Sequence, residues 1–396
     1  MKYLFLFLSV VMLGACGKNK SNSIEREDLF SLDIGPMEDQ IALYQFEGDM
    51  GAPLAGFTMR DGLFYIADGN SGKIVRYNSY GDLLFLIYND ETNPAPLSLI
   101  TNIEEGERAT RWAFSYPLKQ PGKIAVDSGK RIYVEDKLPA QSHRFDAESK
   151  ALLDGIILRF DQNGRFIDYL GREGIGGSPF SRIVGLTASI RDELAVICRV
   201  PSGWNAYWYG PSGALLYMVK IDSSAIPSPQ DRAVSLSSVD RIAAALDSRR
   251  LYIKADYYRD IFDQSTNTRT GSEPGSSIIW ILNVEDGTYS GAVEIPLYEL
   301  TENGRSSEIK MIYSLLGVMR GGKVLLYFPV DAGYSILFLD TRTREQRRGY
   351  IQFSNNEIRF SDFNLSPDGI ISAMLVDDFR VKMAWWRTDK IIGEAR

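Results

Sequence analysis

The stretch that decides the fold is YIADGNSGKIVRYNSYGDLLFLI, residues 65 to 87. It holds two apolar alternations and two turns that contain glycine. Alternation with a period of two is typical of half-buried β-strands, and short Gly-containing or Asn-containing segments between such runs are typical of tight turns. This segment therefore predicts β-strands that are joined by short turns.

The same pattern of strand, tight turn and strand recurs along the chain. A first pair of predicted strands begins at six places, namely Gly56, Lys123, Gly185, Arg241, Leu316 and Phe363. A second pair follows each of them, as in IILRFDQNGRFIDYLG, residues 156 to 171. A four-stranded sheet with such short turns cannot bury both of its faces alone, so the units must pack face to face around an axis. We therefore predict an all-β, six-bladed β-propeller with four-stranded antiparallel blades. The alternative, a pair of stacked sandwiches, does not account for six repeats of one unit.

Two segments also carry a family resemblance. FYIADGNSGKIVRYNSYGDLLFLIY begins at Phe64, and IYVEDKL at Ile132 is followed by GIILRFDQNGRFIDYLGREGIGGSPFSRIVGL from Gly155. Both resemble NHL repeats, and the later units keep the period while losing most of the consensus. Taken whole, the chain resembles uncharacterised spirochaetal lipoproteins with a degenerate NHL-like propeller. The resemblance implies the fold and supplies no activity.

The N-terminus, MKYLFLFLSVVMLGAC, resembles a bacterial lipoprotein signal peptide. Its apolar run is too short for a spanning helix, which needs about 20 residues. The resemblance implies cleavage between Ala15 and Cys16 and a diacylglycerol group on the Cys16 thiol, with fatty-acid chains such as palmitate. We therefore divide the chain into a signal peptide (1–15), a flexible lipid tether (16–27) and a single propeller domain (28–396).

This reading places the protein in the bacterial cell envelope, anchored to a membrane through Cys16. Gly17 follows the cysteine in place of the aspartate that retains lipoproteins in the inner membrane. The sequence therefore favours the outer membrane, with the body in the periplasm or on the cell surface.

Ring closure requires an N-terminal strand that completes the last blade. Leu29 to Ile34 alternates and follows the predicted tether, so we expect it at the outer edge of the sixth sheet. The stretch from Ile41 to Phe46 is the alternative.

Composition excludes some classes of partner. The chain has 44 Lys and Arg against 51 Asp and Glu, a formal net charge of −7, and its basic residues are dispersed. This distribution disfavours nucleic-acid binding. Cys198 is the only cysteine besides Cys16 and lies in an apolar alternation, so we expect a buried small side chain and no disulfide.

Long insertions fall on one predicted face of the propeller. They comprise Asn89 to Gln120, Lys137 to Asp154, Tyr257 to Ser277 and Tyr298 to Lys310, whereas the turns of the opposite face are tight. Loops on a rigid scaffold commonly carry binding sites, and Trp, Tyr and Arg dominate interface energetics. We therefore predict binding through aromatic and arginine side chains of the insertion face, namely Trp112, Phe114, Tyr116, Trp204, Tyr257, Tyr258 and Arg259. The alternative is that these side chains cover the cores of their own loops.

Aspartates recur at the end of the second strand of five units, at Asp68, Asp136, Asp256, Asp331 and Asp377. Together they could form a ring of carboxylates that holds Ca²⁺, which takes six to eight oxygen ligands. The competing interpretation is structural, because an aspartate at this place in NHL-like repeats accepts hydrogen bonds from the next turn.

The sequence offers little for catalysis. His143 is the only histidine, and we find no Walker A loop, dinucleotide-binding glycine pattern or G-x-S-x-G motif. We therefore expect a non-catalytic scaffold without a cofactor that binds an envelope protein, a peptide or a glycan. The alternative is a Ca²⁺-dependent hydrolase resembling six-bladed lactonases.

Overall fold

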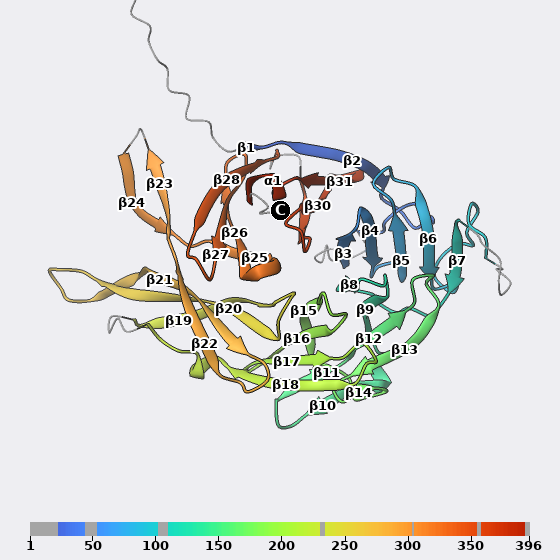
Figure 1. The fold of residues 1–396 in the computed structure, drawn as a ribbon, viewed down its shortest axis with the longest axis horizontal. Helices are drawn as coiled ribbons and strands as arrows, with labels where there is room; N and C mark the ends of the chain where they lie inside the picture. Colours follow the sequence, from blue (N-terminus) through green and yellow to red (C-terminus); the bar gives the residue numbers. More distant parts are fainter. Residues whose placement is uncertain are drawn as a thin grey trace, which may run out of the picture.

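Six small β-sheets stand around a common axis in the computed structural model (Figure 1). The structure describes residues 23–43, 54–101, 110–229, 234–302, 305–354 and 358–392. The predicted signal peptide, Cys16 and the first part of the predicted tether lie outside these residues.

The first three blades follow each other along the chain. Blade 1 contains β3 (Ala55–Arg60), β4 (Leu63–Asp68), β5 (Lys73–Tyr77), β6 (Leu83–Tyr88) and β7 (Trp112–Ser115). Blade 2 contains β8 (Ile124–Val126), β9 (Ile132–Lys137), β12 (Gly155–Phe160), β13 (Phe166–Gly171) and β14 (Gly174–Ile175). Blade 3 contains β15 (Arg182–Ala188), β16 (Leu194–Val200), β17 (Gly203–Tyr209) and β18 (Leu215–Asp222).

The other three blades complete the ring. Blade 4 contains β19 (Leu236–Ala244), β20 (Arg250–Phe262), β21 (Arg269–Asn283) and β22 (Tyr289–Ile295). Blade 5 contains β25 (Ser314–Val318), β26 (Lys323–Val330), β27 (Gly333–Asp340), β28 (Gln346–Gln352) and β1 (Ser23–Ile24). Blade 6 contains β29 (Phe360–Leu365), β30 (Ile371–Val376), β31 (Arg380–Trp386) and β2 (Arg26–Asp33). The predicted all-β, six-bladed propeller is confirmed.

The inner strands line a central channel. They are β3, β8, β15, β19, β25 and β29, and each contacts the inner strands of both neighbouring blades. The hydrophobic clusters lie between neighbouring blades, so each sheet buries both of its faces against its neighbours.

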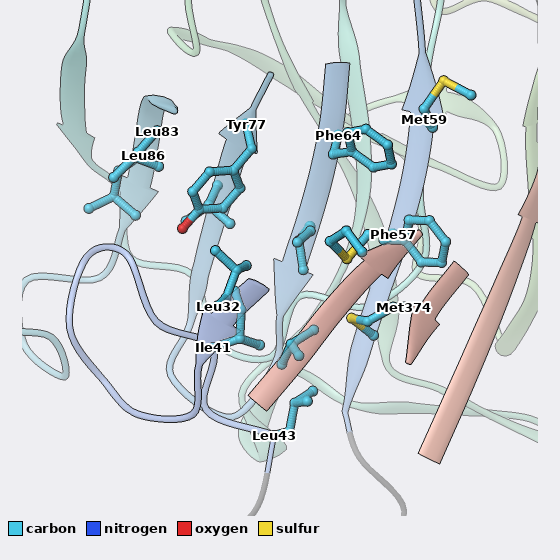
Figure 2. Close-up of a cluster of buried hydrophobic side chains, with 14 of the residues drawn as sticks. Leu32, Ile41, Leu43, Phe57, Met59, Phe64, Tyr77, Leu83, Leu86 and Met374 are labelled. Atoms are coloured by element: carbon cyan, nitrogen blue, oxygen red, sulfur yellow. The ribbon is translucent and has the colours of Figure 1, made fainter. Parts of the chain in front are cut away.

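Strand β2 closes the ring. It pairs antiparallel with β31, with Leu32 opposite Val381, which confirms the prediction for the segment that begins at Leu29. Leu32 enters the cluster between blades 1 and 6 together with Phe57 and Met374 (Figure 2). In the alternative segment, Ile41 forms only an isolated bridge with Ile34, and residues 44–46 lie outside the described part.

The predicted tether was wrong in its last residues. Ser23 and Ile24 pair in parallel with Tyr350 and Ile351 of β28, and β2 already begins at Arg26. The reason is that Ile24 buries its side chain in the hydrophobic cluster between blades 5 and 6, so the chain is held from Ser23 onward.

Several outer strands receive a further strand that the four-strand pattern did not predict. β7 adds in parallel to β6, β1 adds in parallel to β28, and the short β14 adds antiparallel to β13. Within the described ranges, the outer edges of β18 in blade 3, β22 in blade 4 and β2 in blade 6 receive none.

The long insertions contain structure of their own. β10 (Arg144–Asp146) and β11 (Ala151–Leu153) form a hairpin within blade 2, and β23 (Tyr298–Glu302) and β24 (Arg305–Met311) form another after blade 4. β20 and β21 continue beyond their blade as a two-stranded ribbon (Figure 1). Each of these segments lies in a connection of the predicted insertion face, which is the face with the second-to-third-strand and interblade connections.

Helices are few and short. The described residues contain α1 (Asp389–Ile392) and the 3₁₀ turns at Ala140–Ser142, Ser223–Ala225 and Arg320–Gly322. Across the described ranges, no helix has the length and apolar character that crossing a bilayer requires.

Candidate functional site

Trp112 lies away from the insertion face, contrary to our prediction. Because β7 runs parallel to β6, Trp112 is opposite Phe85, while Ser115 is opposite the last residue of β6. The indole Nε1 donates to the carbonyl oxygen of Asn163, in a tight turn of the opposite face, at 2.5 Å. The ring stacks on Phe85 at an interplanar angle of 10°, and the Arg76 guanidinium lies 5.5 Å from its centre. Trp112 therefore joins blades 1 and 2.

Phe114 and Tyr116 also belong to this outer boundary and are partly buried. The Tyr116 ring contacts Phe160 and Phe166 of blade 2, with centroid distances of 5.2 and 4.8 Å. These contacts favour a packing role for this part of the predicted set.

The residues predicted around Tyr257 lie at the base of the β20–β21 ribbon. Tyr257 is completely buried; its hydroxyl donates to the carbonyl oxygen of Pro227 and accepts a hydrogen bond of 2.7 Å from Trp280 Nε1. Tyr258 and Arg259 follow on the same strand and are partly exposed. The buried Tyr257 cannot contact a partner, whereas its two neighbours can.

Trp204 lies beside a cavity on the insertion side of blade 3. It is 9% exposed and belongs to the hydrophobic cluster between blades 3 and 4. The Arg199 guanidinium lies 3.8 Å from the centre of the indole, and Arg199 Nη1 donates to the carbonyl oxygen of Gly203 at 3.2 Å. This cation–π contact fixes the start of β17 next to the cavity.

We call this cavity the hairpin pocket. It has a volume of about 270 Å³ and lies between the β10–β11 hairpin of blade 2 and the outer strands of blade 3. Its lining residues are Asp146, Glu148, Ser149, Arg172, Val200, Ser202, Trp204, Asn205, Tyr207, Met218, Lys220, Ile221 and Asp222. An aromatic floor with polar groups around it is the usual composition of a binding pocket.

Two ion pairs connect the β10–β11 hairpin to its surroundings. Arg172 Nη1 lies 3.0 Å from Asp146 Oδ2, and Lys220 Nζ on β18 lies 2.5 Å from Glu148 Oε1. The second pair is exposed on both sides, so it contributes little to stability and can open at small cost. Deeper in the pocket, burial raises the pKa of Tyr207 to about 12, which keeps its hydroxyl protonated at neutral pH.

The structure does not bring the predicted aspartates together. Asp68 is completely buried and accepts hydrogen bonds from the backbone N–H groups of Ala42, Asn70 and Ser71. Asp136 accepts from the N–H groups of Lys119 and Gln120 in the next connection.

The remaining aspartates of the set also have interaction partners. Asp377 accepts from the N–H groups of Phe379 and Arg380, Asp256 is paired with Lys254, and Asp331, which follows β26, also has an interaction partner. Among the described residues, no group of three or more His, Cys, Asp or Glu side chains could hold a metal ion. The geometry therefore favours the structural interpretation of these carboxylates over a Ca²⁺ site.

The structure confirms the expected burial of Cys198 and shows a local contact of His143. Cys198 is buried and free. His143 Nε2 lies 2.8 Å from the carbonyl oxygen of Leu138 within its insertion.

Comparison with known proteins adds solved structures of propellers. A gluconolactonase from Xanthomonas campestris is 12% identical and aligns over 91% of this chain and 99% of its own, with a TM-score of 0.38. The calcium-binding protein regucalcin from Agrobacterium tumefaciens is 9% identical over 91% and 94%, with a TM-score of 0.39. The WD40 domain of Toxoplasma gondii coronin is 8% identical over 92% and 87%, with a TM-score of 0.38. No protein-family model and no curated protein sequence matches the chain.

Proposed function

We propose that this protein is a lipid-anchored, non-catalytic propeller of the bacterial envelope that binds an extended segment of another envelope protein. The observation that carries the proposal is the position of the hairpin pocket beside β18. Met218, Lys220 and Asp222 of this strand line the pocket, and β18 has no further strand on its outer edge in the described part of the chain.

The fold itself supports this mode of binding. In blades 1 and 5 the outer strand accepts an added parallel strand, β7 or β1, so an outer edge of this propeller can accept another strand. A peptide strand added to a sheet edge gains affinity from backbone hydrogen bonds and specificity from pockets for alternate side chains. β18 combines a free edge with such a pocket.

The outer edge of β22 is less suited to binding. Arg344 Nη2, from a turn of blade 5, donates to the carbonyl oxygen of Ala292 on β22 at 3.0 Å. No such capping contact reaches β18 from the residues that the structure describes, and Leu216 and Met218 on this strand are 40% and 41% exposed. We therefore assign binding to β18 and use β22 as the control edge.

Selection from a library of displayed extended peptides, with the full chain in detergent as target, tests the proposal. Peptides selected on the native protein should lose affinity tenfold or more on Met218→Lys and on Lys220→Glu, because an added lysine opposes edge pairing and a reversed charge changes the pocket rim. Ser290→Lys, on the edge of β22, should retain binding. Failure to select any peptide, or equal loss in Ser290→Lys, would count against the proposal.

A further inference from the structure

Two adjoining cavities lie at the centre of the propeller. The axial cavity has a volume of about 180 Å³ and is lined by the inner strands of all six blades. The side cavity, of about 150 Å³, lies between blades 5 and 6 and shares Arg241, Leu316, Asp362 and Phe363 with it. Neither cavity shares a lining residue with the hairpin pocket.

Three charged side chains converge on the axial cavity from alternate blades. Lys123 directly precedes β8 in blade 2, Arg241 lies on β19 in blade 4, and Asp362 lies on β29 in blade 6. Lys123 and Arg241 are exposed, and Asp362 is partly buried. The cavity thus offers two cations and one carboxylate to a molecule that enters it.

Arg241 is held in position by backbone groups of the next blade. Its Nη1 donates to the carbonyl oxygens of Leu315 and Leu316, at 3.1 and 2.8 Å. This anchoring fixes the guanidinium at the boundary between blades 4 and 5. Its remaining N–H groups stay available for a carboxylate, which a guanidinium can bind in a bidentate manner.

Lys123 and Asp362 form no ion pair with any described residue, whereas the nearby carboxylates are engaged. Glu135 accepts from the Lys123 backbone N–H at 3.1 Å, and Asp240 accepts from the Leu315 N–H at 2.9 Å. Burial raises the pKa of Asp362, and the charges of Lys123 and Arg241 oppose this effect. Lys123, Arg241 and Asp362 are therefore the groups that a ligand can engage.

The side cavity provides an apolar compartment next to these charges. Its lining consists mainly of aromatic and aliphatic residues, namely Leu316, Tyr327, Tyr334, Ile336, Ile351, Phe363 and Ile371, with Ser361, Arg241 and Asp362 at the charged end. Both cavities are smaller than the roughly 300–1,000 Å³ of sites for drug-sized ligands, so they select a small molecule.

We propose that the two cavities bind a free α-amino acid with an apolar side chain. Arg241 and Lys123 bind its carboxylate, Asp362 binds its ammonium group, and the side chain occupies the side cavity. A ligand without an ammonium group leaves the partly buried Asp362 without a cation, and a long polar side chain loses its water in the apolar side cavity; both are costly.

Isothermal titration of L-phenylalanine and L-leucine into the full chain in detergent tests this proposal. We expect binding that falls tenfold or more in Asp362→Asn and in Arg241→Gln. The matched control, Asp368→Asn, removes an exposed aspartate of blade 6 outside both cavities and should leave the affinity unchanged. If Asp362→Asn does not fold, Leu316→Trp, which fills the junction of the two cavities, should abolish binding without a change of charge.

Two derivatives distinguish a free amino acid from the end of a peptide. N-acetyl-L-phenylalanine lacks the ammonium group and L-phenylalanine amide lacks the carboxylate, so each should bind at least tenfold more weakly than L-phenylalanine. Equal binding of either derivative, unchanged affinity in Asp362→Asn, or no binding of apolar amino acids at millimolar concentration would overturn the proposal.

Discussion

The Lys254 ammonium lies 2.7 Å from both carboxylate oxygens of Asp256, and the Lys254 side chain is completely buried. Ser277 Oγ donates to the same carboxylate at 2.6 Å, and Asp240 lies 3.5 Å from the ammonium. This cluster connects the first three strands of blade 4 with β25, the inner strand of blade 5, since Asp240 also accepts a hydrogen bond from the Leu315 N–H.

Loss of one member of this pair should be strongly destabilising. We expect Lys254→Met to lower the free energy of unfolding by about 3–5 kcal/mol, because Asp256 is then left as a buried charge without its cation. Chemical denaturation measures the change. The double variant Lys254→Met, Asp256→Leu should recover most of the loss, and a single variant as stable as the native protein would contradict the assignment.

Lys73 should make stability depend on pH. It is buried, it donates to the carbonyl oxygens of Pro36 and Met37 at 3.3 and 2.7 Å, and burial lowers its pKa from 10.5 to about 8. Because the folded pKa is the lower one, the unfolded chain binds more protons between pH 8 and pH 10.5, and this group's contribution to stability rises with pH in that window. Denaturation at pH 7, 8, 9 and 10 should show a gain of up to about 3 kcal/mol in the native protein relative to Lys73→Met. If the free energy of unfolding changed with pH in the same way in both proteins, a contribution of Lys73 would be excluded.

Leu32 should be important for ring closure. Its side chain is 5% exposed, in the cluster between blades 1 and 6 (Figure 2). We expect Leu32→Ala to lower the free energy of unfolding by about 2–5 kcal/mol, through lost burial and the cavity that remains. Ser31→Ala, at the exposed neighbouring position, should change it by less than about 0.5 kcal/mol. Similar effects of the two substitutions would argue against β2 as the closing strand.

Trp112 should act on stability and not on partner binding. Trp112→Ala removes the hydrogen bond to Asn163 and the stacking on Phe85, and we expect a loss of about 2 kcal/mol, below the range for a fully buried tryptophan. Peptides selected on the native protein should bind this variant unchanged under conditions in which it is folded. If the folded variant lost peptide binding, Trp112 would have to be part of the binding site, as the sequence predicted.

Cys16 should decide membrane attachment. We expect Cys16→Ala to lose incorporation of a labelled fatty acid and to leave the membrane fraction, since the acyl chains supply most of the membrane affinity. Cys198→Ala is the control and should remain labelled. A labelled Cys16→Ala protein would show that the lipid is attached elsewhere or that the signal peptide is not of the lipoprotein type.

Local patterns predicted the blades because each hairpin is encoded within a few residues. The turn at Gly81 is one example, since its φ of 85° is a conformation that glycine adopts without strain. Strand β2 was also predictable, because ring closure requires a partner for β31 and the alternation at Leu29 offers one.

The pairings between distant segments were not predictable in this way. β7 lies in a long insertion, and its parallel pairing with β6 depends on the path of the intervening chain. That path places Trp112 beside Asn163 of another blade. In the same way, Lys123, Arg241 and Asp362 come together only through the ring, because no short-range pattern connects them.

Ring closure by β2 also sets the order in which the protein can fold. Glu27 accepts a hydrogen bond from Trp385, a residue 358 positions later, so β2 finds its partner β31 only when the last strand has been made. At a synthesis rate of about 5–20 residues per second, this separation corresponds to a delay of roughly 20–70 s. During that interval β2 has no strand to pair with, and the ring can close only after the C-terminal blade has been made.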